Sequence, residues 1–176
     1  MLDPQLEEKV KRIKILILDV DGVLTDGRIF MDDNGVEIKA FDIKDGHGIR
    51  MAQRAGLKIA LLSGRKSQTV LKRAEELEVV DVLQGMIDKL KGYEILREKY
   101  RLNPEEMAYI GDDVIDIPVL RRVGFSVAVP DAVSEAKEAA HYIAQLPGGR
   151  GAVREVIDLI LKVQGRWDEV MERYYR

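Results

Sequence analysis

No cysteine occurs among the 176 residues of the sequence, so disulfide bonds, thiolate chemistry and cysteine zinc sites are excluded. The sequence also has no excess of basic residues. Its formal net charge is -3, and without a broad positive field we expect no nucleic-acid partner. No basic-then-apolar leader opens the sequence, and the apolar run at residues 13–18 is far too short to span a membrane. We therefore expect a cytoplasmic protein with no membrane partner.

What the sequence does contain suits a globular protein with a full hydrophobic core. Apolar residues make up 46% of the chain and charged residues 34%. A chain of this length is long enough for one such domain and marginal for two. No internal repeat, low-complexity tract or linker interrupts it. We therefore predict a single domain over residues 1–176.

Short apolar or β-branched runs alternate with longer stretches that have helical spacing. This alternation is typical of a parallel sheet covered by helices. We expect strands at residues 13–18, 57–62, 79–83, 107–110 and 125–129, with an edge strand at 142–144. We expect helices near residues 47–55, 67–77, 90–100 and 134–139, followed by C-terminal helices at about 151–175. The predicted fold is a three-layer α/β, Rossmann-like parallel sheet with helices on both faces.

One segment, residues 27–41, departs from the alternation. Two short extended runs are joined there by Asp32, Asp33, Asn34 and Gly35, and Asn-Gly is a strong signal for a hairpin turn. The hairpin leaves directly after the first strand, so it should stand over the carboxyl end of that strand. No insertion elsewhere is large enough to form a cap domain. We predict a protruding β-hairpin in place of a cap.

Acidic and hydroxyl residues follow three of the expected strands. In open α/β sheets, sites form at the carboxyl ends of the strands. Asp19 and Asp21 follow the first strand two positions apart, so extended backbone would point their side chains the same way. The second strand is followed by Ser63, and the fourth by Asp112, Asp113 and Asp116. We therefore expect these side chains to converge on one site.

Carboxylates gathered in this way repel one another unless a cation lies between them. An all-oxygen site that also receives phosphate suits Mg²⁺, which lets an anionic carboxylate attack an anionic phosphoryl group. Asp19, at the end of a rigid strand, is the expected nucleophile. Asp21, on the turn, is the expected proton donor to the leaving alcohol and later the base that activates water. Ser63 and Lys89 are expected to bind the phosphoryl oxygens.

Taken in order, these motifs resemble the haloacid dehalogenase superfamily of phosphatases. The pattern of that superfamily is D-x-D-G, then Ser or Thr after a strand, then Lys, then G-D-D-x-x-D. The sequence meets it at residues 19–22, at Ser63, at Lys89 and at residues 111–116. A lone D-x-D-G would be weak support, but the four motifs arrive in order at suitable spacing and cover nearly the whole chain.

The resemblance implies a mechanism and a set of metal ligands. The nucleophile Asp19 would form an aspartyl-phosphate intermediate. Mg²⁺ would be bound by Asp19, Asp112 and the backbone carbonyl of Asp21. Asp113 and Asp116 would support those ligands or replace one of them.

A narrower resemblance concerns the substrate. The hairpin and the runs D-V-D-G-V-L-T-D-G, D-G-H-G-I-R, L-S-G-R-K and G-G-R-G-A-V-R-E resemble 3-deoxy-D-manno-octulosonate 8-phosphate phosphatases. That family serves lipopolysaccharide synthesis, has no large cap domain and forms homotetramers in which the hairpins meet. The resemblance implies hydrolysis of a small anionic sugar-acid phosphate. A neighbouring subunit would then cover the otherwise open site.

The sugar acid carries a carboxylate, and basic residues are expected near the site. Arg65 comes just after Ser63, Arg73 lies eight residues further on, and Arg150 stands between glycines as a candidate mobile arm. The substrate contacts of the family also fall on the stretch after the hairpin. The full expected substrate-binding set is Asp21, Asp42, Ile43, Lys44, Asp45, Gly46, Arg50, Gly64, Arg65, Arg73, Lys89 and Arg150.

Simpler roles stay open for some of these residues. Ser63 is also a candidate cap for the next helix, and Lys91 is a nearby alternative to Lys89. Asp116 is also a candidate first-turn helix residue, which the helix dipole favours. The glycine-rich stretch at residues 148–151 is an ordinary flexible loop in the alternative interpretation.

Other functions are alternatives to the phosphatase. A phosphatase of a nine-carbon sugar-acid phosphate keeps the fold and changes the substrate. A receiver domain also uses a phosphorylated aspartate, a hydroxyl residue and a lysine on a parallel sheet. Against the receiver, the acidic pair lies two residues apart with glycine following, and the second acidic cluster comes after the lysine. A phosphomutase usually carries a sizeable cap, and an idle interaction module has no need of the full acidic set.

Overall fold

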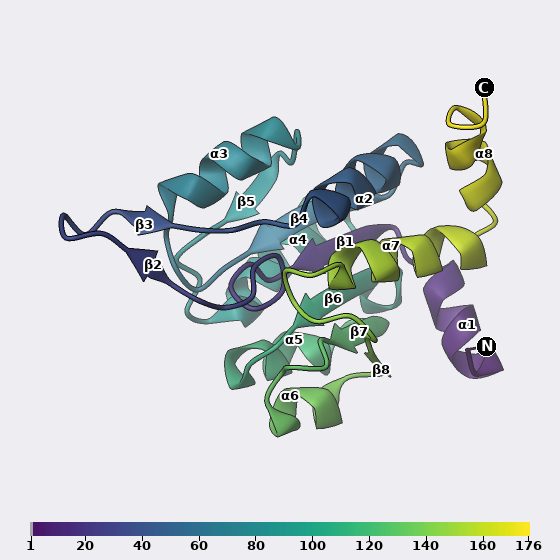
Figure 1. Cartoon of the computed structure of the whole chain (residues 1–176). Helices are drawn as coiled ribbons and strands as arrows, with labels where there is room; N and C mark the ends of the chain where they lie inside the picture. The colour runs from purple at the N-terminus through teal and green to yellow at the C-terminus, as the bar shows by residue number, and fades with distance from the viewer. Residues whose placement is uncertain (1) are drawn as a thin grey trace.

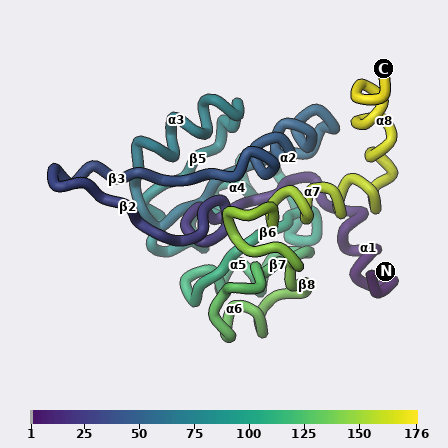
Figure 2. The backbone as a smooth tube through the Cα atoms, in the orientation of Figure 1, coloured from purple at the N-terminus to yellow at the C-terminus, as the bar shows by residue number. Residues whose placement is uncertain are grey.

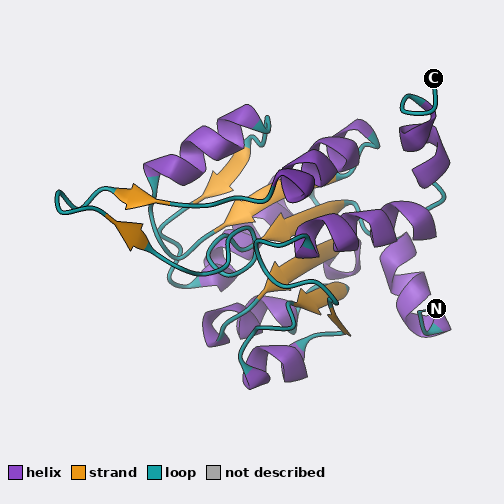
Figure 3. Cartoon of the chain, viewed as in Figure 1, coloured by secondary structure: helices purple, strands orange, loops and turns teal. Residues whose placement is uncertain are grey.

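A six-stranded sheet forms the centre of the structure, with helices on both sides of it (Figure 3). The computed structural model describes residues 2–176. The strands lie in the order β5-β4-β1-β6-β7-β8, with bounds β1 Ile15–Leu18, β4 Lys58–Leu62, β5 Asp81–Leu83, β6 Met107–Gly111, β7 Phe125–Ala128 and β8 Tyr142–Ile143. Every pairing within this sheet is parallel. The predicted three-layer α/β fold is confirmed.

Two groups of helices cover the faces of the sheet (Figure 1). On one face α2 (Ile43–Arg54) packs beside α7 (Ala152–Val163), and α3 (Gln68–Glu76) lies against the start of α2. The other face carries α4 Lys89–Tyr100, α5 Ile117–Leu120 and α6 Ser134–Ala139. The remaining elements are α1 Pro4–Lys11, α8 Trp167–Glu172 and the short 3₁₀ turns η1 Pro104–Glu106 and η2 Val114–Asp116.

The central strands are apolar along their whole length because both of their faces are covered. All four residues of β1 are buried, as are all five of β6. Helix α7 instead buries a single stripe, since its inner positions recur every three or four residues. That stripe consists of Val153, Val156, Ile157, Ile160 and Leu161.

The predicted hairpin is present and projects beyond the carboxyl edge of the sheet, while both termini lie at the other end of the molecule (Figure 2). It consists of β2 (Phe30–Met31) and β3 (Glu37–Ile38), which pair antiparallel. In the turn, Asp32 Oδ1 accepts hydrogen bonds from the amides of Asn34 at 2.9 Å and Val36 at 2.7 Å. Gly35 has a φ of 78°, a conformation that glycine adopts without strain.

Two elements differ from the sequence-based expectations. Helix α1 was not expected at all. Helix α2 begins at Ile43 instead of near residue 47, because Asp42 caps it and accepts from the amides of Lys44 at 2.7 Å and Asp45 at 3.1 Å. The stretch that follows the hairpin is therefore the first turn of a helix. Within residues 2–176, none of the helices combines the length and the apolar character needed to cross a membrane.

Candidate active site

The carboxyl edge of the sheet brings together the residues that follow β1, β4 and β6. These three strands are neighbours, and Leu18 pairs with Leu61 on one side and Ile110 on the other. The residue after β1, Asp19, donates its amide to the carbonyl of Ile110 at 3.0 Å. Ser63 follows β4, and Asp112 follows β6. The three expected positions are therefore adjacent at one edge.

A buried lysine joins this edge from the first position of α4. Lys89 Nζ lies 2.7 Å from Asp19 Oδ1, bonds to Asp116 Oδ1, and donates to the hydroxyl of Tyr109 at 3.1 Å. The lysine side chain is fully buried. An ammonium group is costly to remove from water, so it needs such partners. The alternative residue Lys91 instead has an exposed side chain, 3.8 Å from Asp88.

Asp116 organises the loop behind the site. Its Oδ2 accepts from the amides of Asp112 at 2.9 Å and Asp113 at 3.0 Å, and its Oδ1 accepts from the Tyr109 hydroxyl at 2.6 Å. The side chain is fully buried. Asp116 therefore fixes the backbone that presents Asp112, in addition to its contact with Lys89. Asp113 points to its own helical turn, where Oδ1 accepts from the amide of Val114.

Tyr109 was missed in the sequence. Its hydroxyl is fully buried between Lys89 and Asp116, and burial raises its pKa well above the usual range. The available signal was a single polar atom on a strand, Met107–Gly111, that is otherwise aliphatic and buried. Buried tyrosine hydroxyls usually have a hydrogen-bond partner, so the position pointed to a polar group nearby.

Carboxylate oxygens of Asp19, Asp112 and Asp116 lie within 4.8 Å of one another. Burial raises the pKa of Asp19 to about 6, with the Lys89 ammonium opposing the rise. Burial, reinforced by the Asp19 carboxylate, raises the pKa of Asp112 to about 9. Both shifts express mainly the cost of burying a charged carboxylate, and the neighbouring carboxylates add to that cost. A hard divalent cation such as Mg²⁺ fits this all-oxygen site. The oxygens of Asp116 already accept protein hydrogen bonds, so Asp19 and Asp112 are the better side-chain ligands.

A glycine makes room for Asp112. Gly22 has a φ of 93°, and a Cβ built on it would lie 1.9 Å from Asp112 Oδ2. The loop of residues 148–151 packs directly against the turn that contains Gly22. A Cβ on Gly148 would lie 1.7 Å from the carbonyl oxygen of Gly22. These contacts explain why glycines stand at both positions. They also make the 148–151 loop a packed neighbour of the site.

Asp21, the expected proton donor, is bonded to a residue that the sequence did not suggest. Lys39, just past β3, donates to Asp21 Oδ1 and lies 3.0 Å from Glu37 Oε1. The other oxygen of Glu37 accepts from Arg65 at 2.5 Å. The signal available in the sequence was the spacing of Glu37 and Lys39, which places both on one face of an extended strand. The base of the hairpin therefore borders the site.

Ser63 is buried, and its Oγ accepts from the amide of Arg65 at 3.2 Å. It does not cap the next helix, because α3 begins at Gln68 and Ser67 occupies the cap position. That alternative is wrong, and Ser63 stands at the carboxyl end of β4 beside Asp19. Gly64 lies in the same turn, where an added Cβ would lie 3.6 Å from Ile115 Cδ1.

Two of the expected substrate contacts are elsewhere in the structure. The Asp45 carboxylate is buried and accepts from the amides of Arg154 at 2.8 Å and Gly151 at 3.3 Å, so it caps α7. Burial raises the pKa of Asp45 to about 6. Arg50 is directed away from the site. The stretch after the hairpin is helical, and each turn of a helix faces a different neighbour, so within the chain these two residues have other partners, and their substrate contacts stay predictions.

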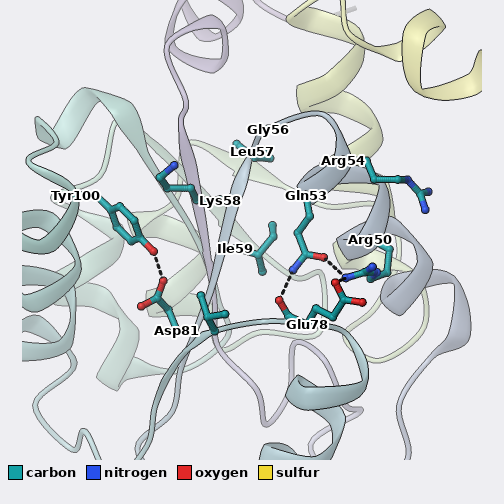
Figure 4. Close-up of a pocket in the computed structure, with 11 residues that line it drawn as sticks. Arg50, Gln53, Arg54, Gly56, Leu57, Lys58, Ile59, Glu78, Asp81 and Tyr100 are labelled. Carbon is teal, nitrogen blue, oxygen red and sulfur yellow. Dashed lines mark hydrogen bonds and ion pairs between the residues drawn. The ribbon is translucent and has the colours of Figure 1, made fainter.

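Figure 4 shows where Arg50 lies. Its guanidinium is 2.7 Å from Glu78 Oε2 and also donates to Gln53 at 3.2 Å. The pocket around it includes Lys58, the first residue of β4, and Asp81, the first residue of β5. This pocket is therefore at the amino edge of the sheet, opposite Asp19.

The other expected substrate contacts lie nearer the carboxyl edge. Arg73 extends from α3 over the ring of Phe41 at 5.7 Å, and the absence of a side chain at Gly46 leaves room for its guanidinium. Arg150 is exposed, and its closest carboxylate is Asp26 at 3.9 Å. Asp42 borders the pocket of Arg73, whereas Ile43 and Lys44 are exposed on the first turn of α2.

Metal binding at the cluster is testable without substrate. Mg²⁺ is expected to raise the melting temperature, because a ligand at 100 times its Kd stabilises the native state by about 2.7 kcal/mol. Asp112→Asn should remove that shift, and chelation with EDTA should silence the wild-type enzyme. Asp168→Asn, an exposed aspartate on α8, is the matched control and should keep the full shift. An equal Mg²⁺ shift in both variants would show that the cation binds elsewhere.

Comparison with known proteins agrees with this geometry. The family model of haloacid dehalogenase-like hydrolases matches residues 74–157. The chain is 48% identical over 168 residues to the 3-deoxy-D-manno-octulosonate 8-phosphate phosphatase of Salmonella typhimurium, covering 96% of this chain and 89% of that protein. It is also 48% identical over 161 residues to the Escherichia coli K12 phosphatase of the same name, covering 92% of this chain and 86% of that protein.

Solved structures are similar over nearly the whole chain. The Yersinia pestis 3-deoxy-D-manno-octulosonate 8-phosphate phosphatase superposes with a TM-score of 0.93 at 43% identity, covering 95% of this chain and 90% of that one. The Moraxella catarrhalis phosphatase, in complex with magnesium, phosphate and KDO, superposes with a TM-score of 0.94 at 38% identity, covering 97% of this chain and 98% of that one. The chain therefore belongs to the 3-deoxy-D-manno-octulosonate 8-phosphate phosphatase family of haloacid dehalogenase-like hydrolases.

Proposed function

We propose that this phosphatase hydrolyses 3-deoxy-D-manno-octulosonate 8-phosphate to KDO and phosphate in lipopolysaccharide synthesis, with Mg²⁺ as its cofactor. The convergence of Asp19, Asp112 and Lys89 at the carboxyl edge supports the chemistry. Relatives at 48% identity support the substrate. A similar structure contains magnesium, phosphate and KDO together. The cytoplasmic location and the single domain stay predictions.

The proposed reaction proceeds in two steps. An Asp19 carboxylate oxygen attacks phosphorus, a new O–P bond forms, and the bond from phosphorus to the sugar oxygen breaks. Asp21 gives a proton to that leaving oxygen. In the second step Asp21 takes a proton from water and the water oxygen attacks phosphorus. The bond from phosphorus to Asp19 breaks, which releases inorganic phosphate and restores the Asp19 carboxylate.

Charge is the main obstacle in both steps. Lys89 touches the nucleophile and neutralises part of the negative charge, and Ser63 is placed to donate to a phosphoryl oxygen. Asp19, Asp112 and the backbone carbonyl of Asp21 would hold Mg²⁺, which when bound would supply the remaining positive charge for the attack of anion on anion.

Substrate recognition is proposed to rely on basic groups at the same edge. Arg65 stands two residues after Ser63, and its side chain is partly exposed, so it is placed to pair with the sugar-acid carboxylate. Arg73 and Arg150 are further cations near this edge. The expected contacts at Asp42, Ile43, Lys44, Gly46 and Gly64 stay predictions. Contacts at Asp45 and Arg50 also stay predictions, and within the chain these two residues have other partners.

The test of this function is phosphate release with Mg²⁺ from a substrate panel. The panel contains the octulosonate 8-phosphate, nine-carbon sugar-acid phosphates, simple sugar phosphates and nucleotides. A strong preference for the octulosonate ester supports the proposal. Preference for a nine-carbon ester would keep the phosphatase and change its substrate. Uptake of a single phosphoryl group without turnover would favour the receiver alternative.

We also propose that the chain assembles as a homotetramer through its hairpins. Five apolar side chains on this small element are at least half exposed, which is unusual for a surface left in water. They are Ile29, Phe30, Met31, Val36 and Ile38. Closed contacts between hairpins would bury this surface and place neighbouring subunits over the open site.

The hairpin surface can be tested by paired substitution. Met31→Ser with Val36→Ser is expected to reduce the molar mass measured by light scattering and to raise the KM. The physical reason is that each serine removes apolar area from the interface and leaves the site more open. The control is Val80→Ser, since Val80 is also exposed but lies next to β5, away from the hairpin. A doubly substituted protein that remains a fully active tetramer would contradict the proposal that hairpin contacts hold neighbouring subunits over the site.

A further inference from the structure

Lys39 is buried although it stands at the base of an exposed hairpin. Only 1% of its side chain is exposed, whereas the preceding residue, Ile38, is 59% exposed. Its ammonium group contacts two carboxylates, Asp21 Oδ1 and Glu37 Oε1, the latter at 3.0 Å. A buried ammonium without such partners would cost several kcal/mol, so these contacts restrict where Lys39 can lie.

The contacts of Lys39 continue into a chain of charged groups. Glu37 also accepts from Arg65 at 2.5 Å through its other oxygen. Burial alone would raise the pKa of Glu37, but its bond to Lys39 and its other contacts lower it overall, so it stays a carboxylate. The hairpin strand β3 is therefore connected to the loop after β1 through Asp21 and to the loop after β4 through Arg65.

We propose that Lys39 is a positioning residue that holds the Asp21 side chain where its carboxyl group can transfer a proton to the leaving oxygen. This inference rests on the proposed function, in which Asp21 is the proton donor. The side chain of Asp21 is about one quarter exposed, and Lys39 is its ion-pair partner among the described residues. Without that bond, Asp21 would sample other rotamers. A displacement of about 1 Å at a reacting group can cost about 100-fold in rate.

A purely structural role for Lys39 makes a different prediction. If Lys39 only anchored the hairpin, its loss would slow all substrates alike. If it positions a proton donor, its loss should matter only when the leaving group needs a proton. The sugar of an alkyl phosphate leaves as an alkoxide unless its oxygen is protonated, whereas the leaving group of p-nitrophenyl phosphate is a stabilised phenolate. Breaking the bond between phosphorus and the leaving oxygen therefore depends on Asp21 in the sugar phosphate and not in the aryl ester.

The experiment compares kcat/KM for these two esters in wild type and in Lys39→Met. This parameter covers steps up to formation of the phosphoenzyme, so later hydrolysis does not obscure it. We expect about a 100-fold loss with the sugar phosphate and less than about threefold with the aryl ester. Lys39→Arg should restore part of the loss. Lys14→Met is the matched control, because Lys14 pairs with Glu106 at 2.5 Å on the amino side of β1.

A double-mutant cycle with Asp21→Asn gives an independent readout. Once Asp21 is replaced, Lys39→Met should have little further effect on the sugar phosphate, because its partner no longer transfers protons. Equal losses with both esters, or additive losses in the cycle, would overturn the positioning role. Wild-type enzyme that turns over neither ester would instead overturn the proposed function. The melting temperature of each variant identifies any loss that comes from unfolding.

Discussion

Asp19→Asn is expected to reduce phosphate release by about four orders of magnitude or more while the fold stays intact. The variant keeps the shape of the side chain but removes the nucleophilic carboxylate, and no other group forms the aspartyl phosphate. The fold should survive because burial already raises the pKa of Asp19 to about 6, so the folded state disfavours its charged form. The measurement is steady-state phosphate release with Mg²⁺, with circular dichroism to confirm the fold.

The matched control for this substitution is Asp3→Asn. Asp3 is exposed before α1, and its side chain forms no capping hydrogen bond, so this variant should retain wild-type turnover. A second readout separates chemistry from binding, since Asp19→Asn should still bind the substrate or inorganic phosphate. Substantial turnover in the Asp19 variant would place the nucleophile at another residue.

Lys89→Met is expected to lower the free energy of unfolding by about 3–5 kcal/mol and to abolish turnover. The lysine is fully buried against Asp19 and Asp116, so its removal leaves two carboxylates without their cation. Burial alone would lower the pKa of Lys89, but these carboxylates raise it overall above the ordinary value of 10.5. Its stabilising effect is therefore fully present below 10.5 and is lost only as pH rises through the folded-state value.

Urea unfolding at neutral and mildly alkaline pH measures this effect, and the loss should be similar at both. Lys91→Met is the control, because its side chain is 78% exposed and an exposed ion pair contributes little to stability. If the Lys89 variant has the stability and turnover of wild type and the Lys91 variant is defective, Lys91 and not Lys89 is the lysine of the site. Mg²⁺ in the unfolding buffer should partly compensate for the missing ammonium.

Much of the fold was predictable because its signals are local. Apolar runs alternate with helical spacing along the chain, and this pattern predicted the six strands of the sheet and most of its helices. The hairpin followed from Asn34-Gly35, whose turn chemistry needs no distant partner. Helix α1 was missed because its pattern is weak, with Val10 as its one buried residue. The start of α2 was placed too late because Asp42 was not interpreted as a helix cap.

The site was predictable where a residue follows directly from the end of a strand. Asp19, Ser63 and Asp112 each stand there, and neighbouring parallel strands must bring such residues together. The partners of Asp45 and Arg50 within the chain were not predictable, for the opposite reason. Within a helix, nearby residues face different neighbours, so closeness in sequence to Asp42 did not place them at the site.

The order of elements and the type of chemistry follow from the sequence, because periodicity, turn residues and strand-end carboxylates are properties of short segments. Which charged groups meet depends instead on the packing of distant segments. Lys39 bonds to Asp21, 18 residues away in the sequence, and Lys89 bonds to Asp116, 27 residues away. Asp45 caps α7 by accepting from the amide of Arg154, 109 residues away. Such pairings depend on the desolvation of each charge and on the partners that packing brings within reach, and no local pattern encodes them.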